Sequence, residues 1–213
     1  MPVNAKICGL SDAASLDAAV AGGASHVGFV FFARSPRNIA SDQAAALAAR
    51  VPGHIGRVGV FVDPDDALLT TAVAAAGLTA VQLHGSEPPA RVAAIRAMTG
   101  LETWKAVPVR TRADLDGAAE YVQAADLLLF DAKPPKGADL PGGLGLRFDW
   151  RLMNGWQPPM RWALSGGLDA GNIAEAVGTT GARLVDVSSG VETAPGAKSA
   201  EKIGAFLRTV KTL

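Results

Sequence analysis

The sequence predicts an α/β fold, a single-domain (β/α)8 TIM barrel of eight parallel strands spanning residues 1–213, and three observations lead to this prediction. Eight short apolar or β-branched runs recur along the chain, and Ala-rich segments with a 3.6-residue period lie between them. No linker-like or low-complexity stretch divides the 213 residues. Eight strand-and-helix units in this length fit a closed barrel better than the alternative, an open doubly wound sheet.

The expected strands are short and apolar, as strands buried on both faces of a parallel sheet are. They cover residues 3–8, 26–32, 56–62, 80–84, 102–107, 127–131, 161–165 and 184–188. In the first strand, alternation with period 2 turns Val3, Ala5 and Ile7 towards the helices. The same alternation turns Lys6 and Cys8 towards the barrel interior.

Several of the expected helices begin at Ser, Asp or Pro, which favour the first turn of a helix. The helices cover residues 12–21, 41–49, 65–76, 88–98, 112–123, 169–177 and 200–210. Between the sixth and seventh strands the helical pattern is weakest, and a helix is expected there at 150–154. Each helix would form the crossover that two neighbouring parallel strands require.

Composition and charge exclude several classes of protein. The chain has 20 Lys+Arg, 20 Asp+Glu and 49% hydrophobic residues, a balance that excludes a disordered chain. Without net charge it has no bulk attraction to nucleic acid or to an anionic membrane, so neither is an expected partner. The single Cys cannot form an internal disulfide, which favours a reducing compartment. The sequence begins without a signal-like segment, and we expect a cytoplasmic protein.

Barrel enzymes carry their chemistry on the loops after the strands, where this sequence places Cys8. A lone Cys is often only a small buried apolar side chain. At the end of a strand and before Gly9, a thiol with an ordinary pKa of about 8.5 is a candidate nucleophile or general base. We expect Lys6 to lie too far below Cys8 on the same face to assist it.

Asp131 ends the strongly apolar sixth strand and is a candidate general acid. Apolar surroundings disfavour the charged form of a carboxyl group, so it can hold a proton near neutral pH. The alternative is a structural carboxylate that caps a loop or pairs with Lys133 or Lys136. Asp186 ends the eighth strand in the same manner, and we interpret it as a positioning group beside the substrate.

Two Gly-containing turns follow the last two strands and predict a phosphate site. They contain Ser165, Gly166 and Gly167, and Ser188, Ser189 and Gly190. Such turns supply close-approaching backbone N–H groups and hydroxyls, and barrels often bind phosphate at these two loops. A purely structural turn is the alternative explanation for each.

The remaining candidates are basic or imidazole groups. Arg37, after the second strand, has a guanidinium suited to gripping a substrate carboxylate at two points, and Arg34 competes for this role. His84, after the fourth strand, is a candidate substrate contact or a partner of its neighbours. His26 and His54 precede strands and belong to the opposite rim, so no multi-histidine metal site is expected at the mouth.

Eight blocks of sequence, in order, resemble the phosphoribosylanthranilate isomerase family, small barrel enzymes of tryptophan biosynthesis. The resemblance covers nearly the whole chain, and its blocks are residues 6–9, 28–37, 58–62, 81–85, 128–131, 142–150, 164–168 and 185–192. It implies an Amadori rearrangement of N-(5-phosphoribosyl)anthranilate without a cofactor or metal. Asp131 matches the acid, Cys8 the base, Arg37 the residue for the anthranilate carboxylate and Asp186 the residue near the anthranilate amine. The turns at 166–167 and 188–190 match its phosphate site.

The resemblance also has a departure and leaves alternatives open. Leu144 stands where the family often has Thr or Ser, which leaves open how the segment 134–147 closes over substrate. Indole-3-glycerol phosphate synthase shares the fold but needs a Lys and Glu set at strand ends, and Lys105 and Glu192 do not provide it. A phosphate-binding barrel without catalysis, serving as a sensor or scaffold, is a third hypothesis. The partner would be a small phosphosugar, and the protein a monomer or homodimer.

Overall fold

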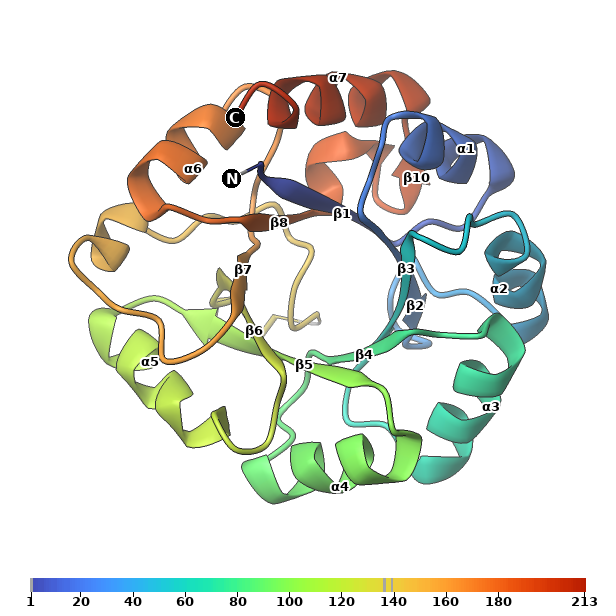
Figure 1. The fold of residues 1–213 in the computed structure, drawn as a ribbon, viewed down its shortest axis with the longest axis horizontal. Coiled ribbons are helices and arrows are strands. Elements are labelled where there is room, and N and C mark those ends of the chain that lie inside the picture. Colours follow the sequence, from blue (N-terminus) through green and yellow to red (C-terminus); the bar gives the residue numbers. More distant parts are fainter. Residues whose placement is uncertain (1, 136, 139) are drawn as a thin grey trace.

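A closed barrel of parallel strands forms the centre of the protein. The structure is a computed structural model, and it describes residues 2–135, 137–138 and 140–213. Strands β1 to β8 pair in chain order, and β8 pairs with β1 to close the ring. Figure 1 views the ring end-on, with the helices arranged around it. The predicted (β/α)8 barrel is therefore confirmed.

The barrel strands lie within about two residues of their predicted positions, which is the usual uncertainty of element ends. They are β1 (Asn4–Cys8), β2 (His26–Phe31), β3 (Gly56–Phe61), β4 (Ala80–Leu83), β5 (Glu102–Val109), β6 (Leu127–Ala132), β7 (Trp162–Leu164) and β8 (Leu184–Val187). The α-helices are α1 (Ala13–Ala21), α2 (Ser41–Ala48), α3 (Asp66–Ala76), α4 (Pro89–Thr99), α5 (Arg112–Gly117), α6 (Ile173–Thr180) and α7 (Ala200–Val210).

Side chains that alternate along the strands fill separate apolar clusters outside and inside the ring. Ala5 and Ile7 of β1, and Val3 just before it, belong to the large core that also contains helix residues such as Leu16 and Phe206, as the period-2 pattern predicts. Inside the ring, a second cluster fills the barrel. Its residues are Val58, Ala80, Trp104, Ala106, Leu127, Leu129, Ala163 and Leu184. The barrel interior is thus packed, and space for a ligand lies above this layer.

Polar residues at helix starts fix where three helices begin. The Asp12 and Asp65 carboxylates accept hydrogen bonds from the backbone N–H groups of Ser15 and Leu68, at 2.9 and 2.8 Å. Asp12 and Asp65 are therefore the N-caps of α1 and α3. Each of these helices begins one residue later than predicted. Ser199 caps α7 in the same way.

Three predicted helices differ from the structure. The expected helix 112–123 ends as α5 at Gly117 and continues as the 3₁₀-helix η1 (Ala118–Tyr121), because a Gly weakens a helix interior. The segment expected at 150–154 is the 3₁₀-helix η2 (Trp150–Met153). Helix α6 begins at Ile173 instead of Asp169, because the Asp169 carboxylate accepts bonds from following N–H groups and forms a turn.

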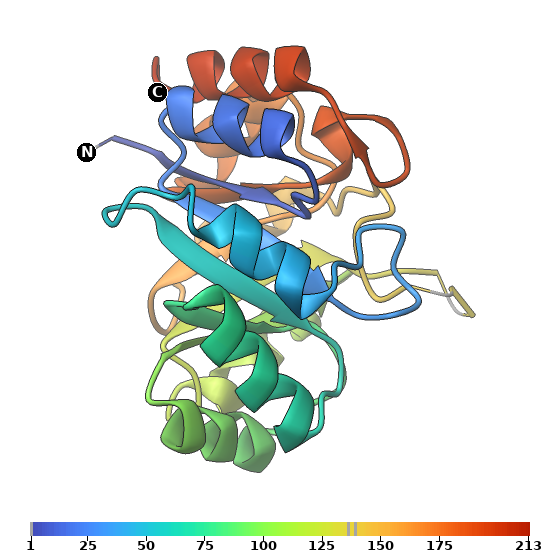
Figure 2. The ribbon, with the colours of Figure 1, turned by 90° about the vertical axis from the view of Figure 1, so that its right-hand side faces the viewer.

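The loop after β8 contains elements that the sequence did not predict. A short 3₁₀-helix, η3 (Ser189–Val191), is followed by two strands, β9 (Glu192–Ala194) and β10 (Ala197–Lys198), which pair antiparallel. In the side view of Figure 2, the N-terminus lies at one end of the barrel. The loops after β2, β6 and β8 extend from the opposite end, where the strands have their carboxyl ends.

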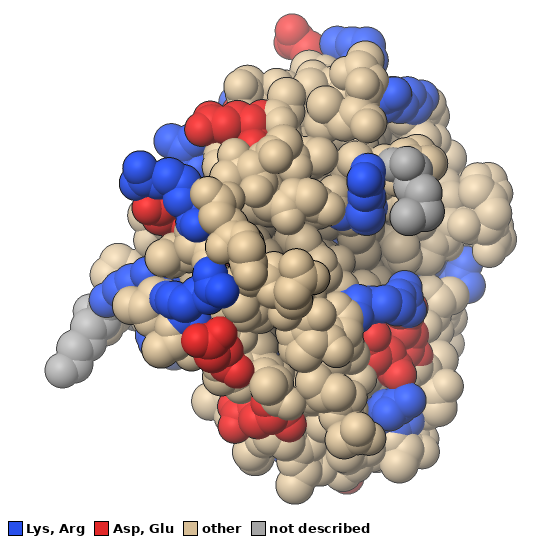
Figure 3. All heavy atoms as spheres, turned by 60° about the vertical axis from the view of Figure 1, so that its left-hand side comes forward, with Lys and Arg blue, Asp and Glu red and all other residues tan. Residues whose placement is uncertain are grey.

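The surface carries both signs of charge. On the face drawn in Figure 3, basic and acidic side chains are interspersed. This agrees with the formal net charge of zero. Within residues 2–135, 137–138 and 140–213, no helix is long and apolar enough to span a membrane.

Candidate active site

A cavity at the carboxyl ends of the strands collects most of the predicted site residues. It encloses about 810 Å³, counting the part that opens to solvent. Its lining includes Cys8, Arg37, His84, Asp131, Gly166, Gly167, Asp186, Ser188 and Ser189. Gly190 lies behind this lining, where a Cβ atom would approach the Leu168 carbonyl oxygen to 1.9 Å. The barrel topology thus brings residues from six strands or their following loops to one place.

Cys8 ends β1 and is 6% exposed, facing the cavity. Burial raises the pKa of its thiol, the positive charge of Lys6 lowers it, and the negative charge of Asp186 raises it again. The net effect is a raised pKa of the Cys8 thiol, because removal from water disfavours a thiolate. The prediction that Lys6 lies too far below Cys8 to assist it was wrong. The ammonium group of Lys6 is near enough for its positive charge to lower the pKa of the Cys8 thiol.

Lys6 is fully buried and paired with Asp186, its neighbour across β1 and β8. The Lys6 Nζ atom lies 3.0 Å from the Asp186 Oδ1 atom. Burial lowers the pKa of Lys6, but the charges of Asp186 and Cys8 outweigh it and the pKa is raised. Lys6 therefore stays an ammonium group beneath the thiol.

Asp131 stands at the end of β6 with 5% exposure. Its Oδ2 atom lies 3.1 Å from His84 Nε2, and its Oδ1 atom accepts a hydrogen bond of 2.8 Å from the Ala132 N–H group. The alternative pairing with Lys133 was wrong, because Lys133 binds Asp114 at 2.9 Å instead. Lys136, the other alternative partner, lies outside the described residues.

Arg37 lines the cavity and is 5% exposed, whereas its competitor Arg34 is exposed. Glu192 binds the guanidinium at two atoms, with 2.7 Å to Nε and 2.8 Å to Nη2. The Nη2 atom also donates to the Gly143 carbonyl oxygen at 3.0 Å. The two-point binding that we predicted between Arg37 and a substrate carboxylate is therefore made to Glu192 instead. The Nη1 atom of Arg37 donates no hydrogen bond to the described residues.

Lys198, and Glu192 as the partner of Arg37, are functional candidates that were not predicted from the sequence. The Lys198 ammonium binds Glu192 Oε1 at 2.8 Å and the Ser188 carbonyl oxygen at 2.9 Å. Burial raises the pKa of Glu192, but Arg37 and Lys198 outweigh it and lower the pKa. The position of Glu192 directly after the strand-eight turn was the available signal. Lys198 reaches the site through the β9–β10 hairpin, which no residue pattern predicted.

The two predicted phosphate loops lie at the cavity, one beside Asp131 and the other beside Cys8. Gly166 and Gly167 have φ angles of +92° and +60°, which side chains other than Gly rarely adopt. A Cβ atom on Gly166 would lie 2.7 Å from Asp131 Oδ1. On the other loop, Ser188 Oγ donates to the Cys8 carbonyl oxygen at 3.3 Å. The glycines allow the backbone to approach the carboxylate closely, while Ser188 joins the β8 loop to β1.

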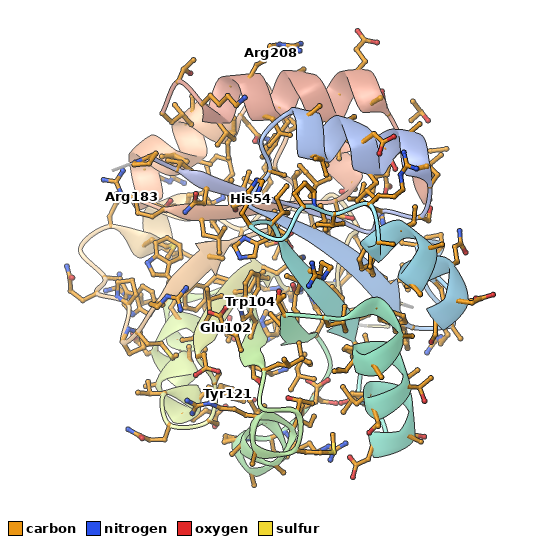
Figure 4. All side chains as sticks on the ribbon, turned by 45° about the vertical axis from the view of Figure 1, so that its right-hand side comes forward. His54, Glu102, Trp104, Tyr121, Arg183 and Arg208 are labelled. Carbon is orange, nitrogen blue, oxygen red and sulfur yellow. The ribbon has the colours of Figure 1, made fainter. Side chains whose placement is uncertain are left out.

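Other groups considered in the sequence lie away from the cavity. Lys105 is 2% exposed, binds Glu87 at 2.7 Å and lies over the ring of Tyr121, so it does not line the cavity. His26, the first residue of β2, contacts Trp104 edge-on. His54 lies in the loop before β3 and is labelled in Figure 4. Within the described part of the chain, no three His, Cys, Asp or Glu side chains form a group suited to a metal ion.

A closed parallel barrel, with a cavity at the carboxyl ends of its strands into which polar side chains converge, defines the class of (β/α)8-barrel proteins, whose enzymes have their active sites at this end. A family model described as N-(5'-phosphoribosyl)anthranilate (PRA) isomerase matches residues 5–209. The chain belongs to this family.

Relatives and solved structures agree with this membership. The N-(5'-phosphoribosyl)anthranilate isomerase of Zymomonas mobilis subsp. pomaceae is 55% identical over 214 residues, covering 100% of both chains. The crystal structure of phosphoribosyl anthranilate isomerase from Thermotoga maritima has a TM-score of 0.89 and 34% identity, covering 99% of this chain and 100% of that one. A phosphoribosyl anthranilate isomerase in complex with reduced 1-(o-carboxyphenylamino)-1-deoxyribulose 5-phosphate has a TM-score of 0.86 and 33% identity, with the same coverage.

Proposed function

We propose that the chain is an intramolecular isomerase that converts N-(5'-phosphoribosyl)anthranilate into 1-(o-carboxyphenylamino)-1-deoxyribulose 5-phosphate, the third step from chorismate in tryptophan biosynthesis. One observation carries the assignment of the chemistry to this cavity. The candidate base Cys8 and the candidate acid Asp131 face the same cavity from β1 and β6, which are separated in the ring by β7 and β8. An aldose-to-ketose rearrangement needs an acid and a base at different atoms of one sugar.

The reaction proceeds in two proton transfers and a tautomerisation. Asp131 gives its proton to the furanose ring oxygen, the bond from C1′ to that oxygen breaks, and the anthranilate nitrogen forms an iminium ion with C1′. Cys8 as thiolate takes the proton from C2′, and the electron pair of that bond neutralises the iminium to give an enolamine. The enolamine then loses its C2′ hydroxyl proton and gains a proton at C1′, which yields the ketone. No cofactor takes part in these steps.

The remaining site residues would bind the substrate. Arg37 offers its Nη1 group to the anthranilate carboxylate, because Glu192 holds the other side of the guanidinium. Asp186 lies near the anthranilate amine, and His84 contacts the substrate beside Asp131. The phosphate site comprises the loop residues Gly166, Gly167, Ser188, Ser189 and Gly190.

The proposal extends to partners and organisation. The partner is a small phosphosugar, with neither nucleic acid nor membrane, which the neutral charge supports. Residues 1–213 act as one barrel domain, located in the cytoplasm, and the protein is a monomer or homodimer. One relative from Thermotoga maritima is described as dimeric, with monomers generated from it.

A fluorescence assay that follows loss of freshly generated phosphoribosylanthranilate tests the function, with the unaltered protein and Cys8→Ala measured side by side. Rapid loss with the unaltered protein alone supports both the isomerase and the role of the thiol. Loss at the uncatalysed rate in a folded, unaltered sample rejects the function and favours a phosphate-binding sensor or scaffold. Equal rates for both proteins reject the role of Cys8 only.

A further inference from the structure

Three polar side chains form a hydrogen-bonded row along one wall of the cavity. Gln82 of β4 is fully buried, and its Nε2 atom lies 3.1 Å from the Nδ1 atom of His84. The Nε2 atom of His84 lies 3.1 Å from Asp131 Oδ2. The row therefore connects the interior of the barrel to the carboxyl group that acts as the acid, with the imidazole as the middle member.

The orientation of the Gln82 amide decides which nitrogen of His84 holds the proton. With Nε2 towards His84, the amide donates to Nδ1, and the Oε1 atom is buried without a hydrogen-bond partner among the described residues. The reverse orientation would turn Oε1 towards His84 and give it a partner. The two N–H groups of the amide would then point to the position where Oε1 now lies, which offers no hydrogen-bond partner among the described residues. With Nε2 towards His84, one amide N–H group and Oε1 have no partner among the described residues, whereas the reverse orientation leaves two N–H groups unpaired. Buried N–H groups without a partner are rarer in proteins than under-satisfied carbonyl oxygens, so the orientation with Nε2 towards His84 is preferred.

A donor at Nδ1 has a direct consequence for Asp131. A neutral imidazole that accepts at Nδ1 has its proton at Nε2, and this N–H group then donates to Asp131 Oδ2. The Ala132 N–H group donates to the other carboxylate oxygen at 2.8 Å. Both oxygens of Asp131 thus accept a hydrogen bond. These two bonds stabilise the carboxylate that forms when Asp131 gives up its proton.

We propose that Gln82 is a positioning residue that holds His84 as the Nε2–H tautomer, so that His84 donates to Asp131 and promotes proton transfer from Asp131 to the substrate. This inference rests on the proposed function in assigning Asp131 as the acid. The tautomer itself does not rest on it. The titratable and charged groups that share the cavity with His84 and Asp131 are Cys8 from β1, Arg37 from the loop after β2 and Asp186 from β8.

The first arm of the test is ¹⁵N NMR of the full chain with labelled histidine, without substrate. The sequence has only three histidines, and the variant His84→Gln assigns the His84 signals. We expect an unprotonated Nδ1 and a protonated Nε2 in the unaltered protein at neutral pH. Gln82→Met removes the donor at similar size, and we expect the Nδ1–H tautomer to become populated. Gln123→Met, an exposed glutamine after η1, is the matched control and leaves the signals unchanged.

The second arm measures kcat, KM and the pH dependence of kcat for the same proteins. We expect Gln82→Met to lower kcat by about tenfold or more, since one positioned acid contributes roughly 10²–10⁴-fold, while KM changes little. The limb of the pH profile that reports the acid is expected to move, which a loss of stability alone would not cause. Gln82→Glu supplies an acceptor in place of the donor, and we expect it to favour protonation of Nδ1.

Three outcomes would overturn the inference: a protonated Nδ1 in the unaltered protein, an unchanged tautomer in folded Gln82→Met, or a changed tautomer with unaltered kcat and pH profile. Far-UV circular dichroism establishes that each variant is folded. If the unaltered protein shows no turnover, the proposed function fails while the NMR arm still decides the tautomer. The two failures are therefore distinguishable.

Discussion

Glu192 binds Arg37 through two hydrogen bonds of 2.7 and 2.8 Å, although 155 residues separate them in sequence. Both side chains are nearly inaccessible to solvent, at 5% and 6% exposure. Lys198, whose side chain is fully buried, binds the same carboxylate at 2.8 Å. One negative charge thus holds two positive charges and joins the loop after β2 to the loop after β8. This relationship sets which face of the Arg37 guanidinium the cavity receives.

Glu192→Gln removes that negative charge, and we expect both weaker substrate binding and lower stability. Breaking one partner of a buried ion pair costs on the order of 3 kcal/mol, because the remaining charge stays buried without compensation. We expect KM to rise more than kcat falls, since Arg37 loses its orientation. Urea unfolding and steady-state kinetics measure the two effects.

Glu102→Gln is the matched control for Glu192→Gln. Its partner Arg161 is 70% exposed, and the two groups lie 2.9 Å apart at the amino ends of the strands. An exposed pair contributes about 0–1 kcal/mol, so the control is expected to keep nearly normal stability and KM. Equal effects of the two substitutions would contradict the role given to Glu192.

Gly166→Ala is expected to abolish most turnover. The added Cβ atom would lie 2.7 Å from Asp131 Oδ1 and 2.8 Å from the Ala132 backbone nitrogen, and the φ angle of +92° is strained for Ala. The carboxylate must shift, which would move it away from the substrate ring oxygen that the proposed function has it protonate. Gly178→Ala in α6 is the control, because its Cβ would meet no described atom within 4 Å. It should raise stability by roughly 0.5–1 kcal/mol without changing kcat.

Asp131→Asn tests the acid directly and keeps the size of the side chain. We expect kcat to fall by roughly 10²–10⁴-fold, because an amide cannot supply the proton. Thermal unfolding should show a folded protein, since the amide can still accept from Ala132. The variant Cys8→Ser should lose most turnover in the same assay. A rate close to that of the unaltered protein in either variant would exclude the role assigned to that residue.

The reactivity of Cys8 should depend on pH in a defined direction. Burial raises the pKa of the thiol, against the positive charge of Lys6, so the thiolate fraction in the free protein is small at neutral pH. The rate of alkylation by iodoacetamide should therefore rise with a midpoint above the ordinary value of about 8.5. Asp186→Asn removes a negative charge that raises this pKa, so its midpoint should lie lower than that of the unaltered protein.

Cys8 is the only cysteine, and mass spectrometry therefore reports a single site. Cys8→Ser gives the background of the labelling experiment. A midpoint below the ordinary thiol value in the unaltered protein would show that Lys6 outweighs burial. That result would contradict the direction argued here.

Local residue patterns predicted the strands and which strand residues face the helices, because both properties depend on residues that are close in the sequence. In β1, alternation alone placed Ile7 among the helices and Cys8 on the cavity. The 3₁₀ continuation after Gly117 and the later start of α6 were missed. Both depend on small differences in local backbone bonding that apolar periodicity does not report.

Residue patterns were enough to predict the closed order of the strands and the rim to which Cys8, Asp131 and Asp186 belong, because strand polarity follows from chain order in a parallel barrel. The pairing of the buried charges, in contrast, is visible in the folded structure and not in the residue patterns. The long side chains of Lys6 and Arg37 reach partners that are far away in the sequence, Asp186 on β8 and Glu192 in the loop after β8. Such pairing depends on the direction of each side chain in the fold and on the exclusion of water around it. The spacing of residues in the sequence predicts neither.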